Sequence, residues 1–295
     1  MEFNTIQLKN KDARAVILTN YGANLLSFKI GDKDIIIYDK EALQNKKSTG
    51  TPVLFPTPNR VRDCLVPYGD KTVLQQKNGT PREIHGLVYD EPFLVESKTQ
   101  TEAVLSIKIN KDSHLYNSFP FECTLRLTYS LFESALTLKY EVVNESDSDF
   151  DFGFAFHPFY AIDDTTEVFI PANTMLDAIG CYPTKKLIPT DEAFESLSTN
   201  GRNAKGLVID NDFTDIFSSP TLKSKSTSIE INMSEDFKHL IVFRKIDSPF
   251  ICIEPQTCSV NAHNLSKEGF EKANLINLKK GESHSGFASV LVDIK

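Results

Sequence analysis

The sequence lacks the segments that would take the protein into or across a membrane. No stretch approaches the roughly 18–20 consecutive apolar residues that a membrane-spanning helix needs. The N-terminal residues MEFNTIQLKNKDARAV carry charges where a secretory signal has its apolar core. We therefore expect a protein that is not exported, that works in the cytoplasm and that has no membrane partner.

A surplus of positive charge is also missing. The chain has 32 basic and 40 acidic residues, a net charge of −8, and the two signs are interspersed without a basic block. Binding to a phosphate backbone needs clustered Lys and Arg, so a nucleic-acid partner is not expected. With 40% hydrophobic and 24% charged residues, the composition is that of an ordinary globular protein.

Closely spaced metal ligands and the common nucleotide and hydrolase motifs are absent. The cysteines stand at irregular spacing and form no CxxC pair, at positions 64, 123, 181, 252 and 258. They predict neither a disulfide framework nor a zinc knuckle, and scattered thiols fit a reducing compartment. None of the six histidines is paired at a spacing of two or four residues, so no metal site is expected. The chain also contains no GxGxxG, GxxxxGK[ST], GxSxG or HExxH.

What the sequence has in abundance is alternation with a period of two. In residues 134–143, apolar side chains alternate with polar or charged ones, which is the pattern of a strand with one buried and one solvated face. A short turn separates this run from residues 123–131, and the two predict an antiparallel hairpin. Further strands are predicted at 14–19, 24–30, 34–38, 105–109, 227–232, 238–243, 249–254 and 287–293.

Helical periodicity is scarce. Only residues 40–47 and 264–273 predict short helices, and without alternating strands and helices a parallel sheet is not expected. The prediction is an all-β protein, a large antiparallel β-sandwich with few short helices. No linker rich in Gly, Ser or Pro divides residues 1–295, so we expect a single domain. Its long functional loops are predicted near 55–84, 171–206 and 255–274.

Two ionisable residues embedded in apolar sequence are candidates for acid/base chemistry. Glu254 precedes Pro255, which cannot donate to a sheet ladder, so we expect the strand to stop here with Glu254 at its mouth. Partial desolvation would raise the pKa of this carboxyl towards that of a useful general base. His157 lies in the run FAFHPFY, where an imidazole beside an apolar wall is a natural proton donor. An ordinary surface glutamate and a structural core histidine remain open as alternatives.

Other residues are candidates for binding a ligand. His85 is followed by Gly86, which permits close backbone approach and could present the ring at a turn. Arg60 follows two prolines, and its guanidinium fork suits vicinal hydroxyls or a carboxylate. Asp210 and Asp212 are interpreted by default as turn-forming aspartates. The aromatic residues that could form either an apolar wall or part of the core are Tyr21, Phe55, Phe156 and Phe159.

In order and spacing, these segments match one family. The chain resembles the aldose 1-epimerase (galactose mutarotase) family from about residue 15 to residue 290, in NYGANLLSF, LFPTPNR, IHG, FAFHPFY, the Asp-rich segment before Phe213, EPQT and LKKGES. The resemblance implies a large β-sandwich, which agrees with the strand pattern. It also implies that His263 and the segment LVYDEPF, where this chain departs from the family pattern, lie at the rim of the pocket.

The resemblance assigns roles to five residues. Glu254 falls at the position of the family's general base and His157 at that of its general acid. Arg60 and His85 fall at sugar-binding positions. The family's substrate-binding aspartate lies three residues before a Phe, which selects Asp210.

The implied reaction interconverts the α and β anomers of a free aldose. Glu254 would take the proton of the C1 hydroxyl and His157 would deliver one to the ring oxygen. The open aldehyde would then rotate and close again with the roles reversed. Neither step needs an electron acceptor, so no cofactor is expected. The expected partner is a small-molecule sugar, and the sequence leaves monomer and homodimer open.

Three other functions stay open at this point. A hexose-6-phosphate 1-epimerase of the same family would need further cations for the phosphate, with Arg62 and Arg82 as candidates. A non-catalytic carbohydrate-binding β-sandwich would use the same walls without acid/base chemistry. A glycoside hydrolase would need two facing carboxylates about 5–10 Å apart, for which the sequence offers Glu254 and Asp210.

Overall fold

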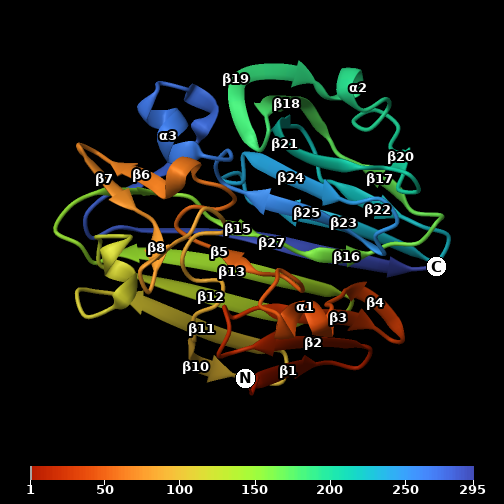
Figure 1. Ribbon diagram of the computed structural model, residues 1–295. Coiled ribbons are helices and arrows are strands. Elements are labelled where there is room, and N and C mark those ends of the chain that lie inside the picture. The colour runs from red at the N-terminus through yellow and green to blue at the C-terminus, as the bar shows by residue number, and fades with distance from the viewer. Residues whose placement is uncertain (1) are drawn as a thin grey trace.

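Two large antiparallel sheets face each other in the computed structural model, which describes residues 2–295 (Figure 1). The larger sheet has twelve strands. They are β1 (Thr5–Lys9), β2 (Ala13–Leu18), β3 (Leu25–Ile30), β4 (Lys33–Ile36), β5 (Val53–Leu54), β15 (Ala155–Phe156), β16 (Phe159–Ala161), β18 (Ala172–Ile179), β19 (Tyr182–Pro189), β21 (Ile209–Ile216), β24 (His239–Arg244) and β25 (Phe250–Gln256). Its centre runs in the order β4-β16-β25-β24-β21-β18.

The second sheet has nine strands. They are β10 (Leu94–Lys98), β11 (Glu102–Ile109), β12 (Cys123–Phe132), β13 (Ala135–Asn144), β17 (Glu167–Phe169), β20 (Arg202–Asn203), β22 (Thr221–Lys223), β23 (Thr227–Met233) and β27 (Ser283–Ile294). Three small two-stranded sheets complete the strands: β6 (Leu65–Tyr68) with β7 (Lys71–Leu74), β8 (Gln76–Lys77) with β9 (Thr80–Pro81), and β14 (Phe150–Phe152) with β26 (Ile276–Leu278).

Helices in the described residues are few and short. They are α1 (Lys40–Gln44), α2 (Thr190–Ala193) and α3 (Ala262–Lys267), with 3₁₀ turns η1 (Arg62–Cys64), η2 (His114–Asn117) and η3 (Glu271–Ala273). No helix among residues 2–295 combines the length and the apolar character needed to cross a bilayer.

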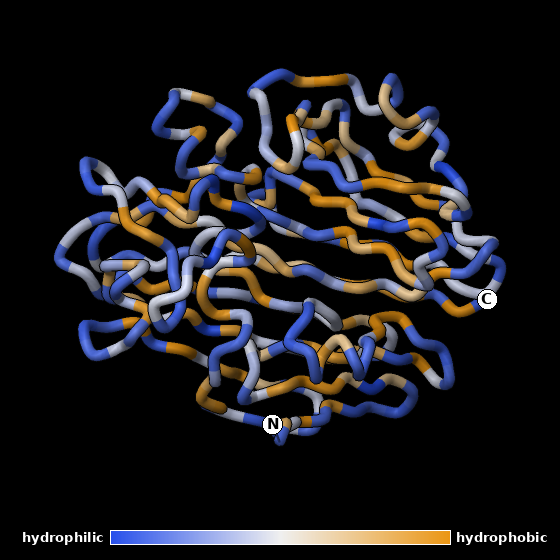
Figure 2. The backbone as a smooth tube through the Cα atoms, viewed as in Figure 1, coloured by the Kyte–Doolittle hydropathy of each residue, from blue (hydrophilic) through white to orange (hydrophobic). Residues whose placement is uncertain are grey.

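The apolar core lies between the two large sheets. Along β12, Leu125, Leu127 and Tyr129 are fully buried, while the residues between them stay partly exposed. Burial of one such leucine side chain stabilises the fold by about 1.5–3 kcal/mol, so this alternation drives the sheets together. The hydroxyl of Tyr129 also donates to the carbonyl of Ala23, just before β3 in the facing sheet. Apolar residues recur along the strands and polar ones gather in the outer loops (Figure 2).

The predicted class, an all-β antiparallel sandwich with few short helices, is confirmed. The predicted hairpin at 123–143 is β12 and β13, which pair from Phe132 with Ala135 onward across a two-residue turn. The predicted helix at 40–47 is α1. The one at 264–273 is wrong in extent, because the chain breaks between α3 and η3 at Gly269, whose φ is +75°.

Two predictions about loops and strand ends are wrong. Residues 171–206 are largely β18, β19 and α2 rather than a long loop. β19 is an edge strand with the sequence YPTKKLIP, and edge strands carry Lys and Pro in place of alternating apolar residues. β25 continues past Glu254 to Gln256, with Pro255 opposite Leu240, so Glu254 lies inside the strand and not at its mouth.

A close backbone approach fixes the loops around Arg60 and His85. Gly86 has a φ of +65°, and a Cβ added there would lie 2.4 Å from the carbonyl oxygen of Phe55. The amide of Leu87 donates to that same oxygen at 2.7 Å, and the amide of His85 donates to the carbonyl oxygen of Asn59 at 2.8 Å. Glycine is therefore needed beside His85, as the sequence predicted.

We expect Gly86→Ala to destabilise the fold more than Gly31→Ala. Both positions have a positive φ, +65° and +56°, but an added Cβ at Gly31 meets nothing within 4 Å. Left-handed backbone costs a non-glycine residue about 1–2 kcal/mol, and overpacking adds about 1–3 kcal/mol at Gly86 alone. Chemical denaturation of both variants measures the difference. Equal losses would show that the contact with Phe55 does not constrain this loop.

Candidate active site

A cavity of about 500 Å³ lies on the face of the larger sheet that is turned away from the core. This volume lies within the range of about 300–1,000 Å³ typical of small-molecule sites. All five residues that the resemblance selects line it: Arg60, His85, His157, Asp210 and Glu254. They come from at least four separate stretches of the chain, so the fold brings together what the sequence separates.

Strand register explains why these side chains share one face. Asp212 pairs with Ile241, which pairs with Glu254. The strand of His157 pairs with β25 through Ala155 with Gln256 and Phe159 with Cys252. Because directly opposite residues point to the same face, this register places His157 opposite Glu254. The intervening residues of β21, β24 and β25 point into the core instead: Phe213, Leu240, Val242, Ile251 and Ile253.

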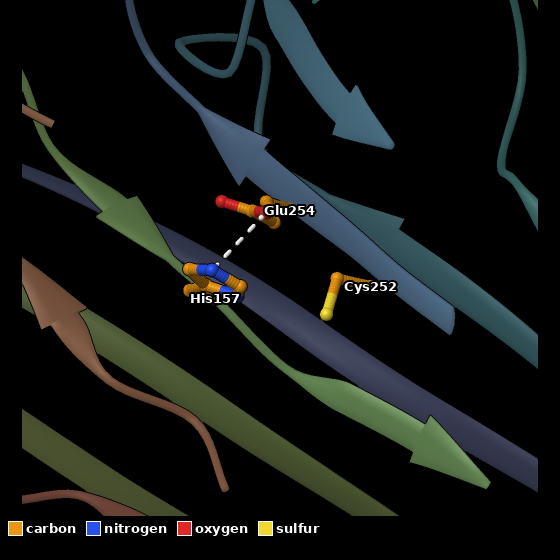
Figure 3. A group of neighbouring side chains, drawn as sticks. All are labelled: His157, Cys252 and Glu254. Atoms are coloured by element: carbon orange, nitrogen blue, oxygen red, sulfur yellow. Dashed lines mark ion pairs between the residues drawn. The ribbon is translucent and has the colours of Figure 1, made fainter. Parts of the chain in front are cut away.

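Two prolines open the sheet between these strands. His157 and Phe159 donate their amides to Pro52 and Gly50 on the far side, so the nitrogen of Pro158 faces β25. The amide of Thr257 donates to Phe154, so the nitrogen of Pro255 faces the strand of His157. Neither proline has a hydrogen to donate, and the ladder is interrupted between β15 and β16. This is why β25 tolerates Pro255 and why the connection carrying His157 leaves the sheet beside Glu254 (Figure 3).

His157 and Glu254 form a close pair in an almost dry setting. The imidazole Nε2 lies 3.4 Å from Glu254 Oε1, and the residues are 6% and 2% exposed. Figure 3 shows the two side chains pointing toward each other from adjacent segments. Their remaining polar atoms, His157 Nδ1 and Glu254 Oε2, find no hydrogen-bond partner within the described part of the chain. Each of these two atoms therefore keeps an unused hydrogen-bonding capacity.

Burial moves the two pKa values in opposite directions. It raises the pKa of Glu254 well above 4.5, and the nearby Asp210 and Asp212 carboxylates raise it further. It lowers the pKa of His157 to about 4. Both shifts have the same cause, because the charged form of each group loses its hydration. The uncharged pair, a carboxylic acid beside a neutral imidazole, is therefore favoured.

Arg60 and His85 stand at the mouth of the cavity on the loops fixed by Gly86. The ring of His85 packs edge-on against His157, with ring centres 5.3 Å apart. Burial and three nearby cationic or ionisable groups lower the pKa of His85 well below 6.5, so it is a neutral hydrogen-bonding ring. Arg60 Nη1 lies 3.8 Å from Glu83 Oε2, too long for a strong bidentate pair, which leaves guanidinium donors for a ligand.

The two aspartates of β21 have different environments. Asp212 is buried, with Oδ1 2.7 Å from His239 Nδ1 and Oδ2 accepting from the amide of Val260 at 2.9 Å. Asp210 is exposed to the cavity, where partial desolvation raises its pKa against the opposing effect of Arg60 and Lys245. Asp210 is thus the aspartate with a free carboxylate. The default interpretation of both residues as turn formers is wrong, because they lie within a strand.

The apolar wall differs from the sequence expectation. Of the four aromatic candidates only Phe159 lines the cavity, stacked on His157 with ring centres 5.0 Å apart. Tyr21, Phe55 and Phe156 are buried in the core, at 4%, 0% and 1% exposure. Sequence reasoning missed the other lining aromatics and the nearby cation, namely Phe243, Phe250 and Lys245. The alternation along β24 and β25 could have identified them, because alternate residues of these strands lie on the same face of the sheet as Glu254.

Three further expectations about the rim are wrong. Arg82 lies away from the lining and is held by a bidentate pair with Asp90, at 3.0 and 2.8 Å. Arg62 stacks over Tyr182 rather than lining the cavity. His263 is buried against Tyr68, with Nε2 3.3 Å from the carbonyl of Asp151. These side chains are already occupied in the fold, so they do not decide what the cavity binds.

One group of side chains has the atoms to ligate a metal ion. Ligand atoms of His157, Cys252 and Glu254 all lie within 4.8 Å of one another. Cys252 lies on β25 two residues from Glu254 and on the same face, which single-sequence spacing to a histidine does not reveal. Burial and the Glu254 carboxyl raise the pKa of the Cys252 thiol well above 9.0, and a metal ion would have to displace that proton to bind the sulfur as a thiolate.

The chain was compared with protein families and with solved structures. A family model described as aldose 1-epimerase matches residues 4–290. A galactose mutarotase-like protein from Clostridium acetobutylicum superposes with a TM-score of 0.87 at 22% identity, over 100% of this chain and 96% of the other. One from Lactobacillus casei gives a TM-score of 0.80 at 20% identity, over 98% and 100%. Galactose 1-epimerase from Lactobacillus acidophilus gives 0.72 at 16% identity, over 100% and 99%.

These findings agree with one another at different levels. The solved structures are below 25% identity, so they show a shared fold. The family model covers nearly the whole sequence and carries the stronger conclusion. The match spans residues 4–290, which include every residue of the cavity. The chain belongs to the aldose 1-epimerase family.

Proposed function

We propose that the protein is an aldose 1-epimerase that interconverts the α and β anomers of a free sugar. The observation that carries this proposal is the pair of His157 and Glu254, whose Nε2 and Oε1 atoms lie 3.4 Å apart on one wall of the cavity. The two oxygens of a hemiacetal are both bonded to C1. Two proton-transferring groups that work on them must therefore lie close together, as these two do.

The reaction needs one base and one acid at the same moment. Glu254 takes the proton of the C1 hydroxyl, and His157 delivers a proton to the ring oxygen, so the C1–O5 bond opens and an aldehyde forms. Rotation about C1–C2 presents the other face of the aldehyde. Closure reverses both transfers and returns each proton to its origin. No electrons leave the sugar, so the cycle needs no redox cofactor.

The pair supports this cycle because its two members share one transferable proton, in addition to the N–H that a neutral imidazole always carries. The uncharged arrangement places that proton on Glu254 and the reactive one places it on His157. A bound sugar offers hydroxyls to the unpartnered Glu254 Oε2, and hydrogen bonds to a carboxylate favour its charged form. Substrate binding therefore shifts the shared proton towards His157. The same pair serves both directions, because either member can be the acid.

Other lining residues are proposed to hold the sugar. Asp210 accepts hydrogen bonds from hydroxyls, while Arg60 and His85 donate to them. Phe159, Phe243 and Phe250 give the apolar faces of the ring a wall. Lys245 stands over Phe243, with Nζ 5.9 Å from the ring centre, where it would meet a group at the far end of the sugar from C1.

Removing either member of the pair is expected to abolish acceleration of anomer exchange. We expect Glu254→Gln and His157→Asn to lower kcat by about 10²–10⁴-fold, the usual contribution of a positioned acid or base. Polarimetry on freshly dissolved α-glucose and α-galactose measures the rate above the spontaneous one. Glu282→Gln and His284→Asn make the same chemical changes outside the cavity and should leave it unchanged. A near-wild-type rate in either cavity variant would remove that residue from the reaction.

The pH dependence of kcat/KM is expected to be a plateau with two limbs. Below a pH of about 4, the lowered pKa of His157, both groups carry protons and no base remains. Above the raised pKa of Glu254 neither carries a proton and no acid remains. The rate therefore falls at both extremes and is flat between them. A buffer blank corrects for spontaneous exchange, and a single limb centred near 6.5 would instead indicate an unperturbed imidazole.

The alternatives are distinguished by the same assay with other substrates. Faster turnover of glucose 6-phosphate than of glucose, lost on Lys245→Ala, would assign the protein to phosphorylated sugars. Sugar binding by calorimetry without faster anomer exchange would indicate a non-catalytic binding module. Release of reducing sugar from an aryl glycoside would indicate a glycoside hydrolase.

A further inference from the structure

A second histidine–carboxylate pair lies beside the candidate active site, on the same face of the larger sheet. His239 on β24 is fully buried. Its Nδ1 lies 2.7 Å from Asp212 Oδ1, and its Nε2 lies 3.0 Å from both the carbonyl oxygen of Lys272 and Asn274 Oδ1. A backbone carbonyl only accepts hydrogen bonds, and so does an ionised carboxylate. Both ring nitrogens of His239 therefore face acceptors, which a doubly protonated imidazolium satisfies.

The partners of this pair belong to the segment that follows β25. Lys272 lies in η3 and Asn274 just after it, while the amide of Val260 donates to Asp212 Oδ2 at 2.9 Å. Val260 itself lines the cavity. Residues 257–274, which include α3 and η3, are thus tied to β21 and β24 at two points. The ties hold this segment over the row of the sheet next to Glu254.

The pair also sets the charge felt by Glu254. Asp212 stands in the same row of the sheet as Glu254, and its negative charge is one cause of the raised pKa of that carboxyl. A positive charge on His239 offsets Asp212. The other groups that face His239 are Asp215 on β21, which is ion-paired with Lys272, and the neutral amide of Gln256 opposite it on β25.

We propose that His239 is a positioning residue in its doubly protonated form, which neutralises Asp212 and clamps residues 257–274 beside Glu254. The consequence for catalysis rests on the proposed function, whereas the protonation state and the clamp do not. His239 does not line the cavity. It acts through Asp212, Lys272 and Asn274.

The sign of the pH effect follows from the same contacts. Burial lowers the pKa of His239, but the Asp212 carboxylate and the three hydrogen bonds outweigh burial and raise it above 6.5. A raised pKa contributes stability that is fully present below about 6.5 and is lost as the pH rises through the raised value. The clamp is therefore closed below a pH of about 6.5 and opens as the pH rises through the raised pKa of His239.

Three readouts on the full chain test this proposal, and none of them depends on activity. ¹⁵N NMR of the imidazoles is expected to show both His239 nitrogens protonated at pH 7. Amide exchange of residues 257–274 is expected to quicken in His239→Gln by about ten- to a hundredfold, as for the loss of hydrogen bonds to a charged group. Carboxyl ¹³C NMR is expected to show the pKa of Glu254 rising in His239→Gln and falling in Asp212→Asn.

The opposite signs distinguish an electrostatic role from a structural one, since general loosening would move Glu254 the same way in both variants. His284→Gln is the matched control, because His284 Nε2 lies 3.4 Å from Asp236 Oδ2 and neither residue lines the cavity. This variant should change none of these readouts. If His239→Gln does not fold, the wild-type nitrogen spectrum and Asp212→Asn still decide. A neutral His239 ring at pH 7, or a Glu254 pKa that Asp212→Asn does not lower, overturns the proposal. Failure of the proposed function would appear only in the polarimetry.

Discussion

The structure depends on one register: the strand of His157 and the strand of Glu254 pair so that these two residues stand opposite each other. Pro158 follows His157 and Pro255 follows Glu254, and neither proline has an amide hydrogen to donate to the facing strand. The two strands therefore separate here, while the pairs on both sides of the gap keep the same register. Burial then makes two isolated charges costly, and the pair keeps a single proton between its members. In the proposed function, acid and base are thereby supplied together by one local arrangement of the sheet. The rest of the sandwich keeps that arrangement rigid.

The strands themselves could be predicted because their cause is local. A strand that buries one face must alternate, and β12, β13 and β27 do so over eight residues or more. Leu125 and Tyr140 are buried and the residues next to them are at least partly exposed, so consecutive residues of the sequence suffice to predict the pattern. The edge strand β19 was missed for the same reason, because its exposure leaves no alternation to detect. Residues alone marked Glu254, His157, His85 and Arg60 as candidates, while the choice of Asp210 over Asp212 came through the family resemblance.

The remaining features of the site depend on pairings between distant residues. Nothing near Asp212 indicates that it meets His239 and the amide of Val260, because the register of β21 on β24 is set by the whole sheet. Likewise, Pro255 predicts a strand end unless the interruption opposite it is known. Phe243 and Lys245 join the cavity through a row that crosses two strands. The sequence therefore shows which side chains have useful chemistry, whereas only the folded structure shows which side chains lie next to them.

The central claim is that His157 and Glu254 act as one proton-sharing unit, and a double-variant cycle tests it most directly. Anomer exchange would be followed by NMR saturation transfer in Glu254→Gln, in His157→Asn and in the variant that carries both changes. Residues that act as a unit are strongly non-additive. The account predicts that the double variant is no slower than the slower single variant. Losses that multiply in the double variant would show two independent contributions and would contradict it.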